Sequence, residues 1–420
     1  MMMQKKSHLI KEKYYTLVFS QLFISEVTGT IFTLYLLSKG MRLIDVNIIL
    51  AAFFITILIM EIPTGVIADV FGRKISITLG FVFNAIAGCV FLSASNLGFF
   101  IIAEILFALG ETLLSGAMEA WMVESINLQE ENNNDIEIIF SHAGIIRQIA
   151  GMLCGIIGAL VATYNYTIPW IIGIIISVLT VIFSILFIKE PFKGDSCVKF
   201  TNPFKSMKAI AGDSFNYSFK NTEIIIFFII AILISFSNSA GNSFQQPRLV
   251  GLFGDRVWIM GWIKFLYSIS MMIGAWFVAY LCKKKIKHIM ILFITGLIVG
   301  AFQILSGVFN TFTPVLCTFL LYEIGRGMYN PISQIYLNAR IPSDKRATIS
   351  SFSSSISQIG MVIGLILTGI ISNLYYDNSN VQEPIRKSWI IYGSIAILAA
   401  FIAAIYNYRK RKFNIVERRF

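Results

Sequence analysis

Charged residues are scarce in this sequence. Only 14% of its 420 residues are Asp, Glu, Lys or Arg, whereas 56% are hydrophobic. A soluble globular chain carries about 25% charged residues, so this chain has too little polar surface to cover a soluble domain of its size. Its apolar residues also form long blocks, many near or above the roughly 18 residues that cross a bilayer. These observations exclude a soluble fold and predict an all-α integral membrane protein, with the lipid bilayer as its partner.

Cysteine and histidine are also rare, and their placement excludes several kinds of site. The five cysteines are odd in number and four of them fall in apolar blocks, so no disulfide framework is expected. The three histidines are isolated, which argues against a metal site and against a Ser–His–Asp triad. The nucleotide-binding pattern Gly-x-x-x-x-Gly-Lys-[Ser/Thr] is missing. We therefore expect that the protein is not an enzyme, that it has no cofactor or metal centre, and that ATP drives no step on this chain.

Twelve apolar blocks predict twelve transmembrane helices, six on each side of the longest polar stretch. The first six cover residues 15–37, 46–66, 75–95, 97–122, 142–164 and 168–189, and the second six cover 222–246, 257–281, 288–309, 312–338, 348–375 and 388–408. This pattern divides the chain into an N-terminal six-helix bundle (1–189), a central cytoplasmic loop (190–221), a C-terminal six-helix bundle (222–408) and a basic cytoplasmic tail (409–420). A weak similarity between residues 141–160 and 351–370 favours two parallel repeats of six spans.

The distribution of basic residues orients these helices. With the N-terminus in the cytoplasm, about 25 Lys and Arg residues fall in cytoplasmic segments and about 6 in external ones. This bias follows the positive-inside rule and predicts that both termini and the central loop are cytoplasmic. The same rule accounts for the net charge of +11, so the charge does not indicate a nucleic-acid partner. The first apolar run is followed by no small-residue cleavage site, and we expect it to remain as the first span.

The loop after the second span contains the most specific motif of the chain. It reads Glu61-Ile-Pro-Thr-Gly-Val-Ile-Ala-Asp69-Val-Phe-Gly72-Arg73-Lys74. The stretch resembles the signature of the major facilitator superfamily, Gly-x-x-x-Asp-[Arg/Lys]-x-Gly-[Arg/Lys]-[Arg/Lys], and departs from it only at Val70, where a base is usual. It also lies where that family carries it, between spans two and three. The resemblance implies the major facilitator fold of two six-helix halves, secondary transport of a small molecule by alternating access, and a monomer.

Simple physical reasons support a role for this loop. Gly65 is expected to let another helix approach closely, Gly72 to permit a tight reversal, and Asp69 to cap the start of the third span. By resemblance, the loop latches the two halves together in one conformation and releases them in the other. We assign this cytoplasmic gate to Glu61, Pro63, Gly65, Asp69, Gly72, Arg73 and Lys74, with Glu124 placed to meet Arg73 or Arg147. The alternative is a basic hairpin that only fixes topology.

The acid and proline at the head of the loop indicate a narrower resemblance. The run Glu-x-Pro-x5-Asp-x3-Arg-Lys is similar to the variant loop of the clostridial tetracycline efflux proteins. This implies a proton-coupled exporter of tetracycline in the cytoplasmic membrane of a bacterium, with the proton gradient as energy source and a divalent cation as an optional companion of the drug. The fifth span keeps Gly151, Gly155 and Gly158 but lacks the proline common in drug antiporters. The alternatives are an uptake symporter for a sugar, peptide or siderophore and, outside transport, a membrane receptor or scaffold.

Six acids fall inside the predicted spans: Glu26, Glu61, Glu104, Glu111, Glu119 and Glu323. A charge at the bilayer centre costs roughly 2.5–3.5 kcal/mol even on a lenient scale, so these side chains are expected to face the interior of the bundle. The spacing of Glu104, Glu111 and Glu119 puts them near one face of a helix. Together with Glu26 they predict a proton-coupling wall of the substrate cavity, because desolvation favours a protonated carboxyl group and a cationic substrate favours the ionised one.

Structural pairing is the other interpretation of these acids. Arg147, Lys264 and Arg326 are bases at membrane depth that can neutralise some of them. Glu323 and Arg326, three residues apart on one helix, predict a structural ion pair. The seventh span ends in a run of Ser, Asn and Gln residues, from which we expect Asn238 and Gln245 to line the substrate cavity.

Overall fold

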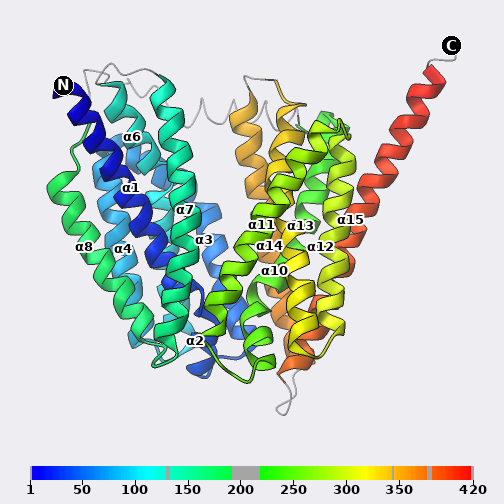
Figure 1. Ribbon diagram of the computed structural model, residues 1–420, viewed down its shortest axis with the longest axis horizontal. Coiled ribbons are helices and arrows are strands. Elements are labelled where there is room, and N and C mark those ends of the chain that lie inside the picture. The colour runs from blue at the N-terminus through cyan, green and yellow to red at the C-terminus, as the bar shows by residue number, and fades with distance from the viewer. Residues whose placement is uncertain (1, 129–132, 192–217, 343–344, 376–380, 418–420) are drawn as a thin grey trace. The chain divides into compact units, whose positions relative to one another are not determined.

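The computed structural model describes residues 2–128, 133–191, 218–342, 345–375 and 381–417, and helices are the only regular secondary structure within them (Figure 1). In chain order they are α1 (Met2–Gly29), α2 (Phe32–Ser38), α3 (Leu43–Phe71), α4 (Arg73–Ser93), α5 (Leu97–Leu114), α6 (Ala117–Asn127), α7 (Asn133–Ala162), α8 (Ile168–Phe187), α10 (Thr222–Leu252), α11 (Ile259–Lys283), α12 (His288–Val308), α13 (Phe312–Asn338), α14 (Arg346–Leu374) and α15 (Gln382–Glu417). The predicted all-α class is confirmed. Most of the predicted central cytoplasmic loop, residues 192–217, lies outside the described residues.

The helices match the predicted spans closely. Within the described part of the chain, ten helices are long and apolar enough to cross a membrane, and the bent pair Leu9–Gly29 with Phe32–Ser38 makes an eleventh. The remaining long helix is α13, with 27 residues; it corresponds to the tenth predicted span and carries Glu323 and Arg326. These helices account for the twelve spans of the predicted membrane fold.

Two of the predicted spans are interrupted rather than continuous. The first, predicted over residues 15–37, bends by 44° between α1 and α2. The fourth, predicted over residues 97–122, breaks between α5 and α6, where Gly116 has a φ of +73°. An L-residue with a Cβ atom adopts this conformation only at a cost, so Gly116 gives the chain its break. The expectation of one uninterrupted helix carrying Glu104, Glu111 and Glu119 was therefore wrong.

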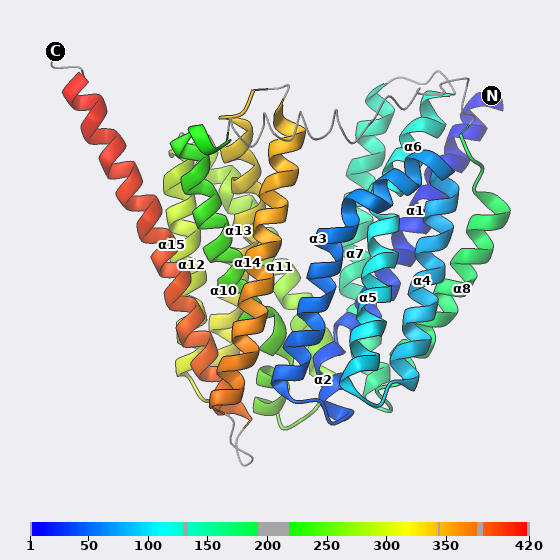
Figure 2. The ribbon, with the colours of Figure 1, turned by 180° about the vertical axis from the view of Figure 1, so that it is seen from behind.

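The chain forms two compact units. Unit 1 contains residues 1–196 and 254–265, and unit 2 contains residues 197–253 and 266–420. In unit 1, α5 packs between α3 and α4, and α4 also packs on α8, so that the four helices form a row (Figure 2). Helix α1 contacts α7 and α8. In unit 2, α12 packs on α13 and α15, while α10 packs on α14 and α15. The start of α11 belongs to unit 1. The predicted domain boundaries at residues 189 and 222 placed this segment in the second half.

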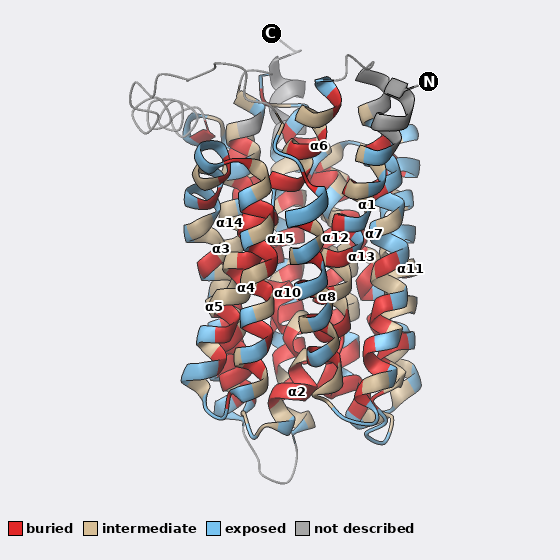
Figure 3. Ribbon diagram, turned by 90° about the vertical axis from the view of Figure 1, so that its left-hand side faces the viewer, coloured by how far each residue is buried: buried red, intermediate tan, exposed pale blue. Residues whose placement is uncertain are grey.

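Helix α8 illustrates how these sequences suit a bilayer. Its buried positions include Gly173, Ser177, Thr180 and Ser184, which recur at helical spacing and are small or hydroxylated. The hydroxyl groups of Ser177 and Thr180 donate hydrogen bonds to backbone carbonyls one turn earlier, so these two hydroxyl groups are satisfied within the helix. The exposed side chains of α8 are instead Ile, Leu, Val and Phe (Figure 3). A small, hydrogen-bonded inner face with an apolar outer face is the pattern of a helix that packs in lipid.

Candidate functional site

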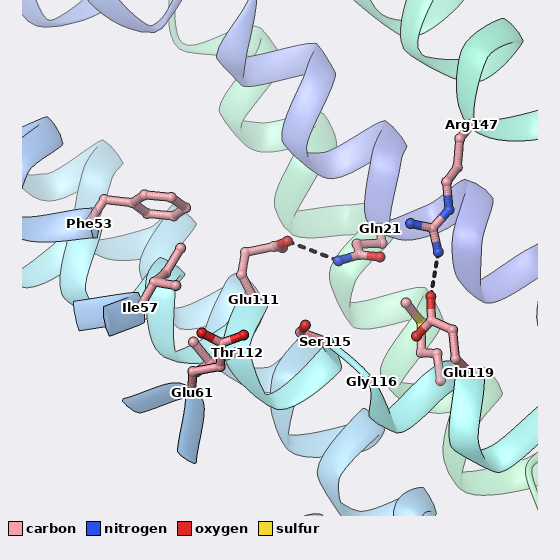
Figure 4. Close-up of a pocket in the computed structure, with 11 residues that line it drawn as sticks. Gln21, Phe53, Ile57, Glu61, Glu111, Thr112, Ser115, Gly116, Glu119 and Arg147 are labelled. Atoms are coloured by element: carbon pink, nitrogen blue, oxygen red, sulfur yellow. Dashed lines mark hydrogen bonds and ion pairs between the residues drawn. The ribbon is translucent and has the colours of Figure 1, made fainter. Parts of the chain in front are cut away.

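Unit 1 contains a cavity of about 450 Å³. Its walls come from α1, α3, α5, α6 and α7 and from the break between α5 and α6. Its lining residues are Gln21, Phe53, Ile57, Glu61, Glu111, Thr112, Ser115, Gly116, Met118, Glu119 and Arg147 (Figure 4). We call it the acidic cavity, because three carboxylates and one guanidinium line it.

Glu111 is held in the acidic cavity by two neutral amides. Gln21 on α1 donates a hydrogen bond from Nε2 to Oε2 of Glu111 over 2.9 Å, and Asn84 on α4 donates from Nδ2 to Oε1 over 3.2 Å. Gly110 makes room for this arrangement, since a Cβ atom there would overlap Oδ1 of Asn84. Amide partners orient the carboxyl group without supplying a compensating positive charge. Because an amide can present either its N–H group or its oxygen, the same two residues are suited to an ionised or a protonated carboxyl group.

Glu61 shares this cavity with Glu111, although the sequence placed it in the gate motif. It lies on α3 two residues before Pro63, which sits inside the helix and lacks a backbone donor. Within the described residues, no hydrogen bond or ion pair involves its carboxylate. The close-up shows the Glu61 carboxylate beside Thr112, the residue that follows Glu111 on α5 (Figure 4). Two acids without a basic partner thus line one cavity.

Glu119 and Arg147 form the charged end of the acidic cavity. Nη2 of Arg147 donates to Oε1 of Glu119 over 2.6 Å, joining α7 to α6 (Figure 4). This is the structural pairing left open as the alternative for Glu119. With Glu61 and Glu111 ionised, the cavity carries three negative charges and one positive charge. It is suited to a proton or to a cationic group.

The other two predicted acids of unit 1 lie outside the acidic cavity lining. Glu26 pairs with Lys264 at the start of α11, over 2.5 Å between Oε2 and Nζ. Gly155 and Gly158 of α7 permit this approach, because a Cβ atom at either position would overlap Lys264 and Thr30 or the backbone of Val27. Glu104 is only 5% exposed, and its Oε2 atom has no hydrogen-bond partner. The predicted wall is therefore divided among three separate environments.

The predicted cavity residues of the second half belong to unit 2. Asn238 on α10 is buried and accepts a hydrogen bond from the hydroxyl group of Tyr322 over 3.2 Å. Oε1 of Gln245 has no hydrogen-bond partner. On α13, Nη1 of Arg326 donates to Oε1 of Glu323 over 2.8 Å, which is the contact that their spacing predicts. Whether these residues meet a substrate stays a prediction.

The gate motif forms a charge network around a one-residue turn. Helix α3 ends at Phe71 and α4 begins at Arg73, with only Gly72, at φ +108°, between them. The guanidinium of Arg73 contacts Asp69 over 2.7 Å and Glu124 over 3.2 Å. Glu124 thus meets Arg73 rather than Arg147. All of these residues lie in unit 1, as does the Lys74 side chain, which donates to the carbonyl of Ile185.

Two expectations about this motif were wrong. Asp69 does not cap α4; instead, the carboxylate of Glu190 accepts hydrogen bonds from the backbone N–H groups of Arg73 and Lys74 over 2.8 and 2.9 Å. Asp69 lies within the last turn of α3, four residues before Arg73, and its carboxylate forms an ion pair with the Arg73 guanidinium. Gly65 does not admit a neighbouring helix, because a Cβ atom there would have nothing within 4 Å.

Sequence reasoning missed Glu190, which is the third residue after the end of α8. The signal was an acid followed by proline at the end of the sixth span, where the helix cannot continue. The α8 end is further fixed by Lys13, which donates to the carbonyl of Phe187 over 2.6 Å, and by Trp121, which donates to the carbonyl of Lys189 over 2.8 Å. Two carbonyls of the last turn of α8, those of Ile185 and Phe187, are thus satisfied by lysine side chains from α4 and α1.

Together, the membrane-spanning helices, the acidic cavity and the charged motif between α3 and α4 define a polytopic membrane transporter. The model of the Major Facilitator Superfamily matches residues 14–365 and 290–418 of this chain, and the chain belongs to that superfamily. It is a secondary transporter and not an enzyme.

Among known proteins, the MFS-type transporter YxaM of Bacillus subtilis (strain 168), itself described as uncharacterized, is 27% identical over an alignment of 357 residues that covers 82% of this chain and 85% of YxaM. The crystal structure of the nucleoside transporter NupG superposes with a TM-score of 0.79 at 16% identity, covering 94% of this chain and 98% of NupG. That of a D-xylose–proton symporter gives 0.67 at 14% identity, covering 94% and 96%. At these identities the two structures support the fold alone.

Proposed function

We propose that this protein is a proton-coupled exporter of a cationic or zwitterionic drug, with tetracycline as the first compound to test. The observation that carries the proposal is Glu111, an acid in a cavity whose direct partners are the neutral amides of Gln21 and Asn84. A carboxyl group of this kind gains a proton when desolvated and loses it when a cation arrives. Exchange of a proton for a cationic substrate is the coupling that an antiporter requires.

The charges of the acidic cavity favour this substrate class. Among the residues that the structure describes, Glu61 and Glu111 have no basic partner, while Glu119 is neutralised by Arg147. With a neutral sugar in the cavity, the negative charges of both acids could be neutralised only by protonation. A cationic substrate would itself supply the compensating charge. Phe53 and Ile57 add apolar surface next to the acids, which suits an amphipathic drug. A tetracycline molecule chelated to a divalent cation would carry such a charge as cargo.

An uptake symporter remains the second candidate. The amide groups of Gln21, Asn84 and Asn238 are donors and acceptors of the kind that bind hydroxyl groups or nucleobases. NupG is a nucleoside transporter and the other structure is a symporter of D-xylose and protons, on a fold that this chain shares. A nucleoside and xylose therefore belong beside tetracycline in the first substrate panel.

The decisive experiment uses inside-out vesicles from cells that express the chain. Tetracycline uptake is followed with an imposed proton gradient, with and without an uncoupler and with and without Mg²⁺. Uncoupler-sensitive accumulation that control vesicles lack is the expected result. If tetracycline does not accumulate but xylose or a nucleoside moves with protons in right-side-out vesicles, the export proposal is wrong and the symporter is correct.

Glu111→Gln tests the coupling residue. The substitution keeps the shape of the side chain but cannot bind or release a proton, so accumulation should fall to the level of uncoupler-treated vesicles. Glu137→Gln, which changes an exposed acid of α7 outside the cavity, is the matched control and should transport normally. Glu104→Gln tests whether position in the cavity, rather than burial of an acid, is what matters for coupling. We expect this variant to retain more activity than Glu111→Gln. Full gradient-driven transport by Glu111→Gln contradicts the assignment.

Asp69→Asn tests the gate. Arg73 would lose one of its two acidic partners, so exchange between conformations should slow while substrate affinity is preserved. Transport rate and equilibrium binding of the same substrate are measured on the same preparation. A loss of affinity with unchanged turnover would remove Asp69 from the gate.

A further inference from the structure

A second cavity, of about 510 Å³, lies in unit 2 and plays no part in the proposed transport site. It opens at the turn between α11 and α12, which lies at the same end of unit 2 as the C-terminal end of α15 (Figure 1). The residues that matter here are Glu223, Lys285, Lys287, His288, Arg340 and Tyr406. We call it the basic cavity. The positive-inside rule assigns this end of the unit to the cytoplasm.

The basic cavity has an excess of positive charge. Arg340 is already held: its Nε atom donates to Glu223, its Nη1 atom donates to the carbonyl of Tyr336 over 2.9 Å, and its guanidinium lies 3.6 Å from the centroid of the Tyr336 ring. Lys285 and Lys287 are exposed, and neither forms an ion pair with an acid among the described residues. Three bases and one acid give the wall a net charge of +2, counting His288 as neutral.

The backbone fixes both lysines at the rim. Helix α11 ends in a Schellman motif, in which Ile286 donates its N–H to the carbonyl of Leu281 and Lys285 donates its N–H to that of Cys282. Lys285 occupies the left-handed position of this motif, with a φ of +57°. Lys287 precedes the first turn of α12 and makes no side-chain cap bond. The two ammonium groups therefore flank the cavity from a defined turn rather than from a long loop.

Helix α15, which contributes Tyr406 to the basic cavity, also carries an exposed apolar face. Tyr406 lines the cavity, and on the same helix Leu398, Phe401, Ile405 and Tyr408 are each more than half exposed. Their spacings of three, four and three residues place these side chains on one face of α15, which is a membrane-spanning helix. A ligand with an anionic head and apolar chains would meet ammonium groups at the cavity and apolar side chains along the helix.

We propose that the basic cavity binds the phosphate group of an anionic phospholipid of the cytoplasmic leaflet, with Lys285 and Lys287 as its ligands and the outer face of α15 beside its acyl chains. Anionic lipids are attracted to basic residues at the cytoplasmic surface, and basic pockets between transmembrane helices bind their headgroups. The apolar face of α15 favours a lipid over free phosphate.

The full-length protein is purified in a neutral detergent, and phosphatidylglycerol binding is measured by native mass spectrometry against phosphatidylcholine with the same acyl chains. The wild-type protein should retain phosphatidylglycerol preferentially. Lys285→Gln with Lys287→Gln should weaken this binding on the order of 10-fold. The matched control is Lys283→Gln with Lys284→Gln, which removes the same charge from the same turn outside the cavity lining and should weaken binding by about twofold or less. Lys285→Arg with Lys287→Arg should bind as the wild type does.

Three outcomes would overturn the proposal. Equal retention of both lipids by the wild-type protein, which requires no variant, would show that the cavity does not select an anion. Equal losses in the two Gln pairs would reduce the effect to the general charge of the turn. Displacement of phosphatidylglycerol by inorganic phosphate at an equal concentration would identify free phosphate, and not a lipid, as the ligand.

Discussion

The turn between α3 and α4 and the turn between α11 and α12 join the second and third predicted spans of the two halves, yet they are built in opposite ways. The first contains one residue, Gly72, and every charged group around it has a partner: Arg73 contacts Asp69 and Glu124, and Glu190 receives two backbone N–H groups. The second carries Lys283, Lys284, Lys285 and Lys287, none of which has an acidic partner among the described residues. One turn is an internally neutralised network, and the other presents positive charge to its surroundings.

Corresponding turns in the two halves of a repeated fold can therefore be suited to different functions. In a turn whose charges are paired with one another, breaking one contact changes the free energy of the conformation, and this sensitivity suits a gate. A turn whose charges are unsatisfied internally gains energy only from an external anion, which suits a binding site. Both turns contain one residue with positive φ, Gly72 at +108° and Lys285 at +57°, so they can be compared by matched substitutions.

The largest effect should come from Gly72→Ala. The backbone at φ +108° and ψ 154° is strained for any residue with a Cβ atom, and that atom would lie 2.7 Å from the Glu190 carboxylate. We expect a destabilisation of about 1–3 kcal/mol together with slower transport, measured as the melting temperature in detergent and the uptake rate in vesicles.

Gly65→Ala is the control for this substitution. Gly65 lies inside α3, and its Cβ atom would meet nothing within 4 Å, so alanine should be neutral or slightly stabilising. If both alanine variants melt and transport alike, the one-residue turn is not the sensitive element and the comparison between the two turns fails.

The sequence was sufficient to predict the spans but not the contacts at their ends. Span positions depend on long apolar runs, and a bilayer imposes that pattern on each helix separately. The network at Gly72 depends on Glu190, more than a hundred residues further on, and nothing local indicates which helix end an exposed acid will cap. The same is true of Glu111, whose depth was predictable, whereas its partner Asn84 is contributed by a different helix.

The helix breaks were a different kind of failure. Hydropathy is blind to φ, so a Gly within an apolar run looks the same whether it is helical, as Gly65 is, or left-handed, as Gly116 is. Composition also cannot separate an acid with amide partners from one with a basic partner. Glu111 and Glu26 are both acids in apolar helices, yet only Glu26 is paired with a base, Lys264.

A smaller effect is expected from Glu190→Ala. The variant loses the two hydrogen bonds that the first N–H groups of α4 donate to the carboxylate, and the favourable interaction of that charge with the helix start. The expected cost is about 1 kcal/mol, measured as a shift in the melting temperature. In Gly72→Ala the new Cβ atom already displaces Glu190, so the double variant should lose less than the sum of the two single losses. Strict additivity would mean that Glu190 and Gly72 do not act together.

The smallest effect should be a gain, from Lys285→Gly. Lys285 holds the left-handed position of a Schellman motif, which costs an L-residue about 1–2 kcal/mol and which glycine usually occupies. The greater freedom of glycine in the unfolded chain offsets part of this relief, so a slight rise in melting temperature is expected. The measurement is made without anionic lipid, because the substitution also removes a proposed phosphate ligand.

Gly40 provides the reciprocal control. It occupies the same position after α2, with a φ of +82°; the N–H of Gly40 donates to the carbonyl of Leu37, and the N–H of Met41 donates to that of Leu36. Gly40→Lys should lower the melting temperature by a similar or larger amount. If Lys285→Gly instead destabilises the protein, the lysine side chain contributes more to the turn than its backbone strain costs, and the α11–α12 turn is then a satisfied structure like its counterpart at Gly72.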